Sequence, residues 1–270
     1  TTEIYTLSLH DALPICVPAH LHVRMSLMAL ANGSAVFIEK PLAVELTPVD
    51  LLIQEARSSG RYNAVAYVYH VMPWLLAARE YVAAGSIGRV LHASVVTGQH
   101  FPTFRPAYRE IYYTRHETGG GAIQDARTHV INATEWLIGP ITSLYADAAH
   151  QHLDGVTVED TVNVVARHGD VLTTYALNQF QAPNEMTLQL HGEHGSIKVE
   201  LHRRSWSHLL RGETVWTEHV TPPLERDDLF TAQANAFLDG MEGKPSPLST
   251  LEEALQSLKV NLAALESART

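Results

Sequence analysis

The 270-residue chain has very little cysteine, no long apolar run and no cluster of basic residues. Its single cysteine, Cys16, excludes an internal disulfide framework and fits a reducing compartment such as the cytoplasm. Because no run of about 18 apolar residues occurs, we expect no membrane-spanning helix. The formal charge of −10 and the scattered Lys and Arg argue against binding to nucleic acid phosphates. These absences leave a soluble, globular, cytoplasmic protein without a membrane or nucleic-acid partner.

The sequence also lacks a G-x-G-x-x-G motif, the phosphate-binding turn of dinucleotide-binding folds. Residues 1–15 have neither the basic start nor the apolar core of a signal peptide. We interpret them as a leader that is foreign to the native protein. On this interpretation the native first βα unit, with its glycine-rich turn, is missing from this chain.

From residue 16 onward, helix and strand patterns alternate. Apolar spacing and stop signals such as Asn32-Gly33 mark the elements. The predicted elements are helices over residues 19–31, 48–60 and 74–84, and strands over 35–38 and 63–69. Strict alternation predicts parallel strands with crossover helices. Residues 16–85 are therefore expected to form the remainder of a truncated Rossmann-type sheet.

Beyond Gly88 strand patterns dominate. The alternation in Thr161-Val162-Asn163-Val164 is typical of a sheet with one covered face. The predicted strands cover 89–97, 142–149, 161–167, 172–179, 186–191, 196–201 and 214–220; a loop covers 98–118, and helices cover 122–138, 228–241 and 251–268. This order predicts a second, α+β domain over 86–270 on a mostly antiparallel open sheet. We expect its last helix to pack on the Rossmann part and its free sheet face to form a homo-oligomer, a dimer or tetramer.

A lysine follows the first predicted strand of this series, in the tripeptide Glu39-Lys40-Pro41. Open α/β sheets bind ligands at the carboxyl ends of their strands, so Lys40 is well placed for a functional role. Pro41 removes a backbone donor, and its bond to Lys40 can be cis, which can hold the lysine backbone at an unusual angle. A surface lysine before a helix is the alternative.

Further on, Gly119-Gly120-Gly121 precedes Asp125 and His129. These two residues lie four apart on a predicted helix and so share one face, and the glycines allow a ligand or another backbone to approach closely. An imidazole with an ordinary pKa of about 6.5 can accept a hydroxyl proton, while the carboxylate orients it or binds a second hydroxyl. This set suits alcohol oxidation. Solvent-facing Asp and His side chains are the alternative.

Taken in order, these motifs resemble those of the Gfo/Idh/MocA family of nicotinamide-dependent sugar oxidoreductases. The similarity spans nearly all of residues 16–270. It is carried by Pro18-Ala19-His20-Leu21-His22, Glu39-Lys40-Pro41, Gly85-Ser86-Ile87-Gly88-Arg89-Val90, Gly119 to His129 and Gly192-Glu193-His194-Gly195-Ser196. One departure is His70, which stands where an arginine is common.

The resemblance implies that Lys40 contacts the reacting hydroxyl and the nicotinamide ribose, and that His129 is the general base. Asp125 would bind the substrate and fix the histidine. The implied cofactor-binding residues are Pro18, His22, Glu39, Lys40 and Pro41. NAD or NADP would accept the hydride, because no amino acid side chain can.

The aromatic and basic loop over residues 99–113 precedes this helix. We predict that Arg105, Arg109 and Tyr113 face the substrate, where an anionic or polyhydroxylated sugar would suit them. Packing against the sheet or a neighbouring subunit is the alternative. None of the 16 histidines lies in a recognisable metal-ligand pattern, so we expect no metal site.

Three functions stay open at this point. The first is hydride transfer between NAD(P) and a hydroxyl carbon of a sugar, inositol or related polyol. The second is an NAD-dependent sugar lyase or glycosidase that oxidises its substrate transiently. The third is a non-catalytic sugar-binding protein, which would fit a chain made inactive by the missing glycine-rich turn.

Overall fold

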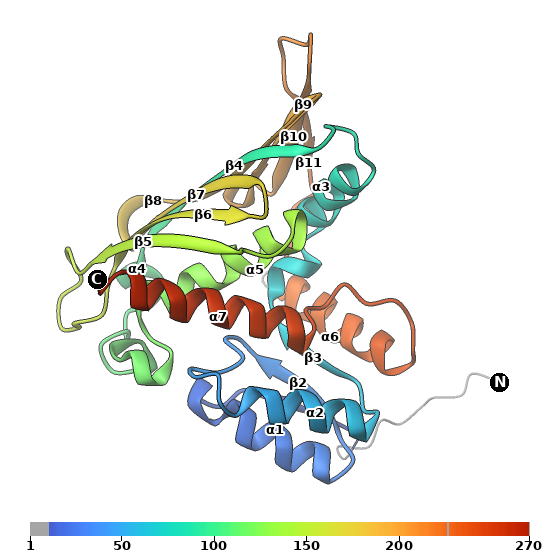
Figure 1. Cartoon of the computed structure of the whole chain (residues 1–270), viewed down its shortest axis with the longest axis vertical. Coiled ribbons are helices and arrows are strands. Elements are labelled where there is room, and N and C mark those ends of the chain that lie inside the picture. The colour runs from blue at the N-terminus through green and yellow to red at the C-terminus, as the bar shows by residue number, and fades with distance from the viewer. Residues whose placement is uncertain (1–10, 226, 270) are drawn as a thin grey trace.

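The computed structural model describes residues 11–225 and 227–269 (Figure 1). Within these residues, a small three-stranded sheet and a larger eight-stranded sheet organise the chain. The small sheet and its helices lie at one end of the molecule, and the large sheet extends away from them. The predicted fold class, a Rossmann-type parallel sheet followed by a mostly antiparallel α+β unit, is confirmed.

The small sheet is parallel, as the alternation of helices and strands predicts. Its order is β1 (Ala12–Ile15), β2 (Ala35–Glu39) and β3 (Asn63–Ala66). Helices α1 (His22–Ala31) and α2 (Val49–Ser59) connect these strands. The predicted strand over 63–69 ends early, because the chain winds into a 3-10 turn at Val68–Val71 that buries His70. Carboxyl strand ends therefore meet at one edge of the sheet, which carries Lys40.

The predicted leader is described only in its last residues. Ala12–Ile15 form β1, and Ile15 is buried and pairs with Ile38 of β2. Residues 1–10 lie outside the described residues. The origin of the leader and the domain boundaries assigned from sequence stay predictions.

The large sheet has the order β11-β10-β9-β8-β4-β7-β6-β5, and β4 runs parallel to β7. Its strands are β4 (Val90–His100), β5 (Ser143–Ala149), β6 (Thr161–His168), β7 (Val171–Asn178), β8 (Phe180–Gly192), β9 (Gly195–Glu200), β10 (Ser205–Leu210) and β11 (Thr217–Val220). Sequence patterns missed β10. Its Ser205 and Ser207 are as buried as Trp206 between them, so polar side chains do not mark an exposed face of this strand.

The segment predicted as a loop over 98–118 contains regular structure. Strand β4 continues to His100, α4 (Phe101–Phe104) follows, and 3-10 turns form at Tyr112–Thr114 and His116–Thr118. The cause is an aromatic cluster in which Phe101, Tyr108 and Tyr113 are buried together. Burial of such large rings stabilises a segment whose sequence shows no helix or strand periodicity.

Helices cover one face of the large sheet: α3 (Pro73–Ala83), α5 (Arg127–Ile138) and part of α7 (Leu251–Ser267). Helix α6 (Asp228–Met241) packs beside the small sheet, where Phe237 joins its core. Helix α7 contributes Leu251 and Leu258 to the small-sheet core, and Val260 to the large-sheet core. It therefore connects the two parts, as Figure 1 shows for the red helix. None of the described helices is both long and apolar enough to cross a membrane.

The start of α7 carries a capping box formed by Thr250 and Glu253. Thr250 Oγ1 accepts from the Glu253 N–H at 3.1 Å, and the Glu253 carboxylate accepts from the Thr250 N–H at 2.8 Å. We expect Thr250→Ala to lower the free energy of unfolding by about 1 kcal/mol, because this capping box is lost. Urea unfolding would measure the change. Thr231→Ala on α6, where no cap is lost, is the control; equal losses in both variants would contradict the capping role.

Candidate active site

A cavity of about 560 Å³ opens where the carboxyl ends of β2 and β3 face the start of α5 and the large sheet. This volume is in the range of pockets that bind small molecules. Its lining includes Glu39 and Lys40 from the end of β2 and Asp125 and His129 from the segment that leads into α5. Tyr112 completes the polar group. The three residues predicted to act together therefore lie in one cavity.

A buried ion pair spans this cavity. Lys40 Nζ donates to Asp125 Oδ1 at 2.9 Å and to the Asp125 main-chain oxygen at 3.0 Å. The Tyr112 hydroxyl donates to the same Oδ1 at 2.9 Å. Burial alone raises the pKa of Asp125, but the Lys40 charge and these hydrogen bonds outweigh it and hold that pKa below its ordinary value. The carboxylate thus stays ionised and fixes the ammonium, and the Lys40–Pro41 peptide bond is cis.

His129 lies against two tyrosine rings, stacked on Tyr69 at 4.9 Å between centroids and edge-on to Tyr67 at 5.9 Å. Among the described residues its Nδ1 is buried without a hydrogen-bond partner, which leaves Nε2 as the nitrogen available in the cavity. Burial and the Lys40 charge lower the pKa of His129 to about 3, against the opposing effect of Asp125. The ordinary pKa expected from sequence is therefore not kept, and the imidazole is neutral at physiological pH.

Within the described residues, no hydrogen bond joins Asp125 to His129, although the resemblance implies that Asp125 fixes the histidine. The reason lies in the backbone. Residues Ala122–Ala126 form a π-helix before α5, so the predicted single α-helix over 122–138 is interrupted. A π-turn inserts an extra residue per turn and turns Asp125 away from the position that α-helical spacing predicts. Asp125 orients Lys40 instead.

The predicted cofactor-binding residues divide into two groups. Glu39 and Lys40 line the cavity, and burial raises the pKa of Glu39 despite the nearby Lys40. His22 is only 1% exposed; its Nδ1 bonds the Pro41 carbonyl at 2.8 Å and its Nε2 the Val17 carbonyl at 2.7 Å. It ties the loop after β1 to the loop after β2 and does not line the cavity. Pro18 is exposed on the first of these loops, and Pro41 is buried in the second.

The predicted substrate residues also divide. Arg105 lines the cavity. Arg109 lies elsewhere, because its Nε donates to the Asp154 carbonyl at 2.8 Å. Tyr113 is fully buried with its hydroxyl bonded to Gln179 Oε1, so its neighbour Tyr112 is the tyrosine of the site. In a Tyr-Tyr pair only the fold decides which ring is buried.

Sequence patterns also missed a set of amide side chains. They line the cavity from the ends of β4, β7 and β8 and from α6: Gln99, Asn178, Gln179, Asn184 and Gln233. Isolated amides carry no motif, so only the fold identifies them.

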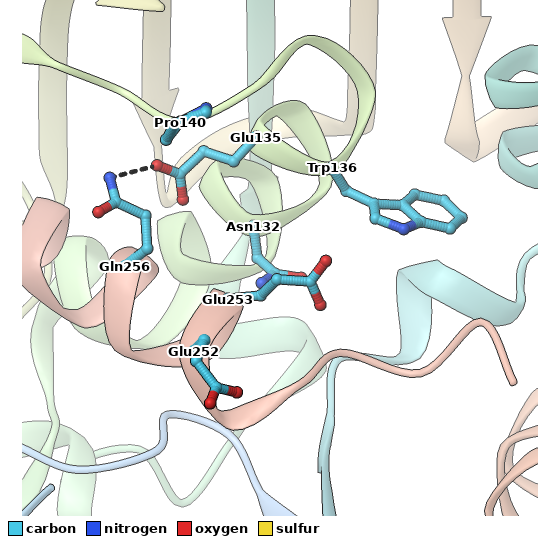
Figure 2. Close-up of a pocket in the computed structure, with 7 residues that line it drawn as sticks. All are labelled: Asn132, Glu135, Trp136, Pro140, Glu252, Glu253 and Gln256. Carbon is cyan, nitrogen blue, oxygen red and sulfur yellow. Dashed lines mark hydrogen bonds between the residues drawn. The ribbon is translucent and has the colours of Figure 1, made fainter. Parts of the chain in front are cut away.

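Another cavity, of about 390 Å³, lies between α5 and α7 (Figure 2). Among the described residues it shares no lining residue with the first cavity. Gln256 Nε2 donates to Glu135 Oε1 at 2.9 Å across it, and the other Glu135 oxygen accepts from Ser257 at 3.1 Å. Trp136 on its rim stacks on the buried His70 at 4.2 Å. The Glu135 carboxylate thus joins α5 to α7.

A parallel sheet whose carboxyl edge carries a lysine, facing a carboxylate and an imidazole from the larger-sheet part in one cavity, is the arrangement expected of a nicotinamide-dependent oxidoreductase. Comparison with models of protein families identifies the family. Residues 3–67 match the model of the oxidoreductase family with an NAD-binding Rossmann fold, and residues 75–198 match the GFO/IDH/MocA C-terminal domain. The chain belongs to the GFO/IDH/MocA family. The predicted family, enzyme class and NAD-type cofactor are confirmed.

Individual relatives are distant. A 1,5-anhydro-D-fructose reductase of Ensifer adhaerens is 26% identical over 96% of this chain and 78% of that protein. A levoglucosan dehydrogenase of Pseudarthrobacter phenanthrenivorans is 27% identical over 70% of this chain and 55% of its own length.

Two solved structures share the fold. An NAD-binding oxidoreductase from Klebsiella pneumoniae gives a TM-score of 0.85 at 20% identity, over 96% of this chain and 78% of that one. A levoglucosan dehydrogenase in complex with NADH and levoglucosan gives 0.84 at 22% identity, with the same coverage. At these identities the likeness shows the fold alone.

The residues of the cavity fit the nicotinamide end of the family's cofactor. Glu39 ends a parallel strand and Lys40 follows it at the crevice edge, where such folds place a dinucleotide. His129, neutral at physiological pH, lines the same space. The ammonium, carboxylate and imidazole together supply the donor and acceptor groups that a reacting hydroxyl needs.

The low pKa of His129 can be measured. Between about pH 5 and pH 8 we expect its ring C–H resonances to stay at the neutral position, because burial disfavours the imidazolium. His116, whose pKa is raised by its hydrogen bond to Glu159, is the internal control and should take up a proton within that range. The unfolded chain binds a proton that native His129 does not, so this residue makes native stability fall as pH drops below about 6.5. Half-titration of His129 near neutrality would contradict the assignment.

Proposed function

We propose that the protein transfers a hydride between NAD(P) and one hydroxyl carbon of a neutral sugar, inositol or related polyol. The observation that carries the proposal is the convergence of Lys40, Asp125, Tyr112 and His129 in one cavity. Bound NAD(P) supplies the hydride acceptor or donor, which side chains cannot provide.

The side chains of the site handle the proton and the orientation. Lys40, held by Asp125, presents its ammonium to the substrate oxygen and stabilises the negative charge that develops there. His129 Nε2 accepts the hydroxyl proton in oxidation and returns it in reduction. Because its pKa is about 3, the ring is unprotonated at physiological pH, which is the form that can accept the hydroxyl proton.

The amides of the cavity favour a neutral, polyhydroxylated substrate. Each amide offers both donors and acceptors, which match hydroxyl groups without requiring a charge on the ligand. Gln99, Asn178 and Asn184 are placed on the large-sheet side, opposite Lys40 on the small-sheet side. The names of relatives agree with this class, including an inositol 2-dehydrogenase of Rhizobium meliloti that is 21% identical over 94% of this chain.

The proposal extends to assembly and location. The uncovered face of the large sheet exposes apolar side chains, among them Val96, Tyr145 and Val165. We place a homo-oligomer contact on this face, since exposed apolar patches of this kind commonly form interfaces. Cys16 is a free, exposed thiol, which fits the cytoplasmic location that we propose.

Substitution of the two central residues tests the function. We expect Lys40→Ala and His129→Ala each to lower kcat by roughly 10²- to 10⁴-fold, because charge stabilisation or proton transfer is lost. NAD(P)H absorbance with a panel of sugars and inositols would measure it, and circular dichroism would check the fold. Lys259→Ala, an exposed lysine on α7, is the control. Near-normal turnover in either variant would refute the roles, and product without net NAD(P)H would point to the transient-oxidation alternative.

The adjacent tyrosines form a matched pair. Tyr112→Phe removes a hydrogen bond to the Asp125 carboxylate, and we expect kcat/KM to fall about 10-fold. Tyr113→Phe removes a buried bond to Gln179, so we expect about 1 kcal/mol lower stability with kcat/KM nearly unchanged. Steady-state kinetics and urea unfolding separate the two effects. The opposite result, with catalysis lost only in Tyr113→Phe, would show that the wrong tyrosine was assigned to the site.

A further inference from the structure

The π-helix that carries Asp125 is attached at its start to one residue of the large-sheet part, Glu159. The Ala122 N–H donates to the Glu159 main-chain oxygen at 3.0 Å, and the Ile123 N–H donates to Glu159 Oε1 at 2.8 Å. Glu159 is 7% exposed and precedes β6. Its other carboxylate oxygen lies 2.6 Å from His116 Nε2. One side chain thus bonds both the helix start and the turn before it.

The glycines before the π-helix make this contact possible. Gly121 has a φ of +88°, and a Cβ there would lie 2.6 Å from Glu159 Oε1 and 2.8 Å from Oε2. Any side chain at this position would displace the carboxylate. A Cβ on Gly120 would collide with the Tyr113 main-chain oxygen at 2.2 Å. In this chain the close approach that glycine allows is therefore made by protein groups.

Cations face the Glu159 carboxylate from two elements. The hydrogen bond to Glu159 raises the pKa of His116 against the effect of its partial burial. The Arg127 guanidinium is 1% exposed and, among the described residues, has no hydrogen-bond partner. Burial lowers the pKa of Arg127 to about 10, and Tyr175 and Glu159 oppose that shift. The negative charge of Glu159 therefore stabilises a buried cation at the first residue of α5.

We propose that Glu159 is a positioning residue that sets the geometry of the Lys40–Asp125 pair. Asp125 lies two residues after Ile123, and both its carboxylate and its main-chain oxygen hold Lys40 Nζ. A displacement of the π-helix would move both Asp125 acceptors at once. The Lys40 ammonium would then lose its position relative to the substrate. The large-sheet part of the chain thereby fixes a lysine that belongs to the small sheet. The catalytic consequence rests on the proposed dehydrogenase function.

The neighbouring acid provides a matched control. The Asp160 carboxylate accepts from the N–H groups of Gln151, His152 and Leu153 at 2.7–2.9 Å, away from the site. Glu159 and Asp160 are adjacent, both buried and both bonded to backbone amides. The Glu159 carboxylate bonds an amide of the π-helix, whereas the Asp160 carboxylate bonds amides of the loop between β5 and β6. A merely structural role would make their substitutions equivalent.

Hydrogen–deuterium exchange, read by mass spectrometry on the protein without substrate or cofactor, tests the positioning directly. We expect Glu159→Ala to raise exchange about 10-fold over residues 122–125, because an anchoring carboxylate is lost. Asp160→Asn should instead raise exchange over residues 151–153. Glu159→Gln, which keeps an oxygen for the Ile123 N–H, should restore most of the protection. Unchanged exchange over 122–125 in Glu159→Ala would overturn the proposal.

Turnover supplies the second readout. We expect Glu159→Ala to lower kcat roughly 10- to 100-fold, as loss of an orienting partner does, with a smaller change in KM. Glu159→Gln should recover part of this loss, and Asp160→Asn should stay near the unsubstituted protein. Equal losses in Glu159→Ala and Asp160→Asn would overturn the positioning role.

The two readouts distinguish the failure of this inference from the failure of the proposed function. If the unsubstituted protein turns over no polyol, the exchange experiment still decides whether Glu159 holds the π-helix. If exchange rises over 122–125 while kcat is unchanged in an active enzyme, the positioning role is refuted and the function stands. Should Glu159→Ala fail to fold, His116→Ala is the second variant. It removes the partner of Oε2, and we expect a smaller rise of exchange over the same residues; no rise would overturn the proposal.

Discussion

The active arrangement depends on a buried ion pair between residues 85 positions apart, Lys40 and Asp125. The two side chains are 13% and 11% exposed, so each charge would be costly without the other. Their pairing joins the end of a strand in the small sheet to the helix that covers the large sheet. The Tyr112 hydroxyl reinforces the same carboxylate. One polar contact thus links the two parts of the chain at the cavity.

Much of the fold could be predicted from local pattern. The helix predicted over 228–241 is α6 (Asp228–Met241), and the capping signal at Thr250 and Glu253 marks the start of α7. Such signals are short-range and therefore visible in sequence. Strand β10 was missed because both of its faces are buried, with Trp206 on one and the two serines on the other. The aromatic turns after β4 were missed because their order comes from tertiary burial. Neither cause leaves a periodic trace.

The site divides in the same way. Lys40, Asp125 and His129 lie in short motifs at informative places in the fold, and the structure brings them into one cavity. Their electrostatics could not be read from sequence, because the low pKa of His129 comes from burial by tyrosines that lie about 60 residues earlier in the chain. Packing also decides that Tyr112 and not Tyr113 lines the cavity, and that His22 bonds two loops. The sequence tells which side chain stands at a position, whereas packing with distant residues sets the direction in which that side chain points.

Helix α7 has a consequence for how the molecule can move. Its first half is buried with the small sheet and its second half with the large one, so it joins the two parts as one rigid element. A hinge movement between the two parts would have to bend α7 or expose leucines from one of the cores. The two parts are therefore expected to melt as a single cooperative unit.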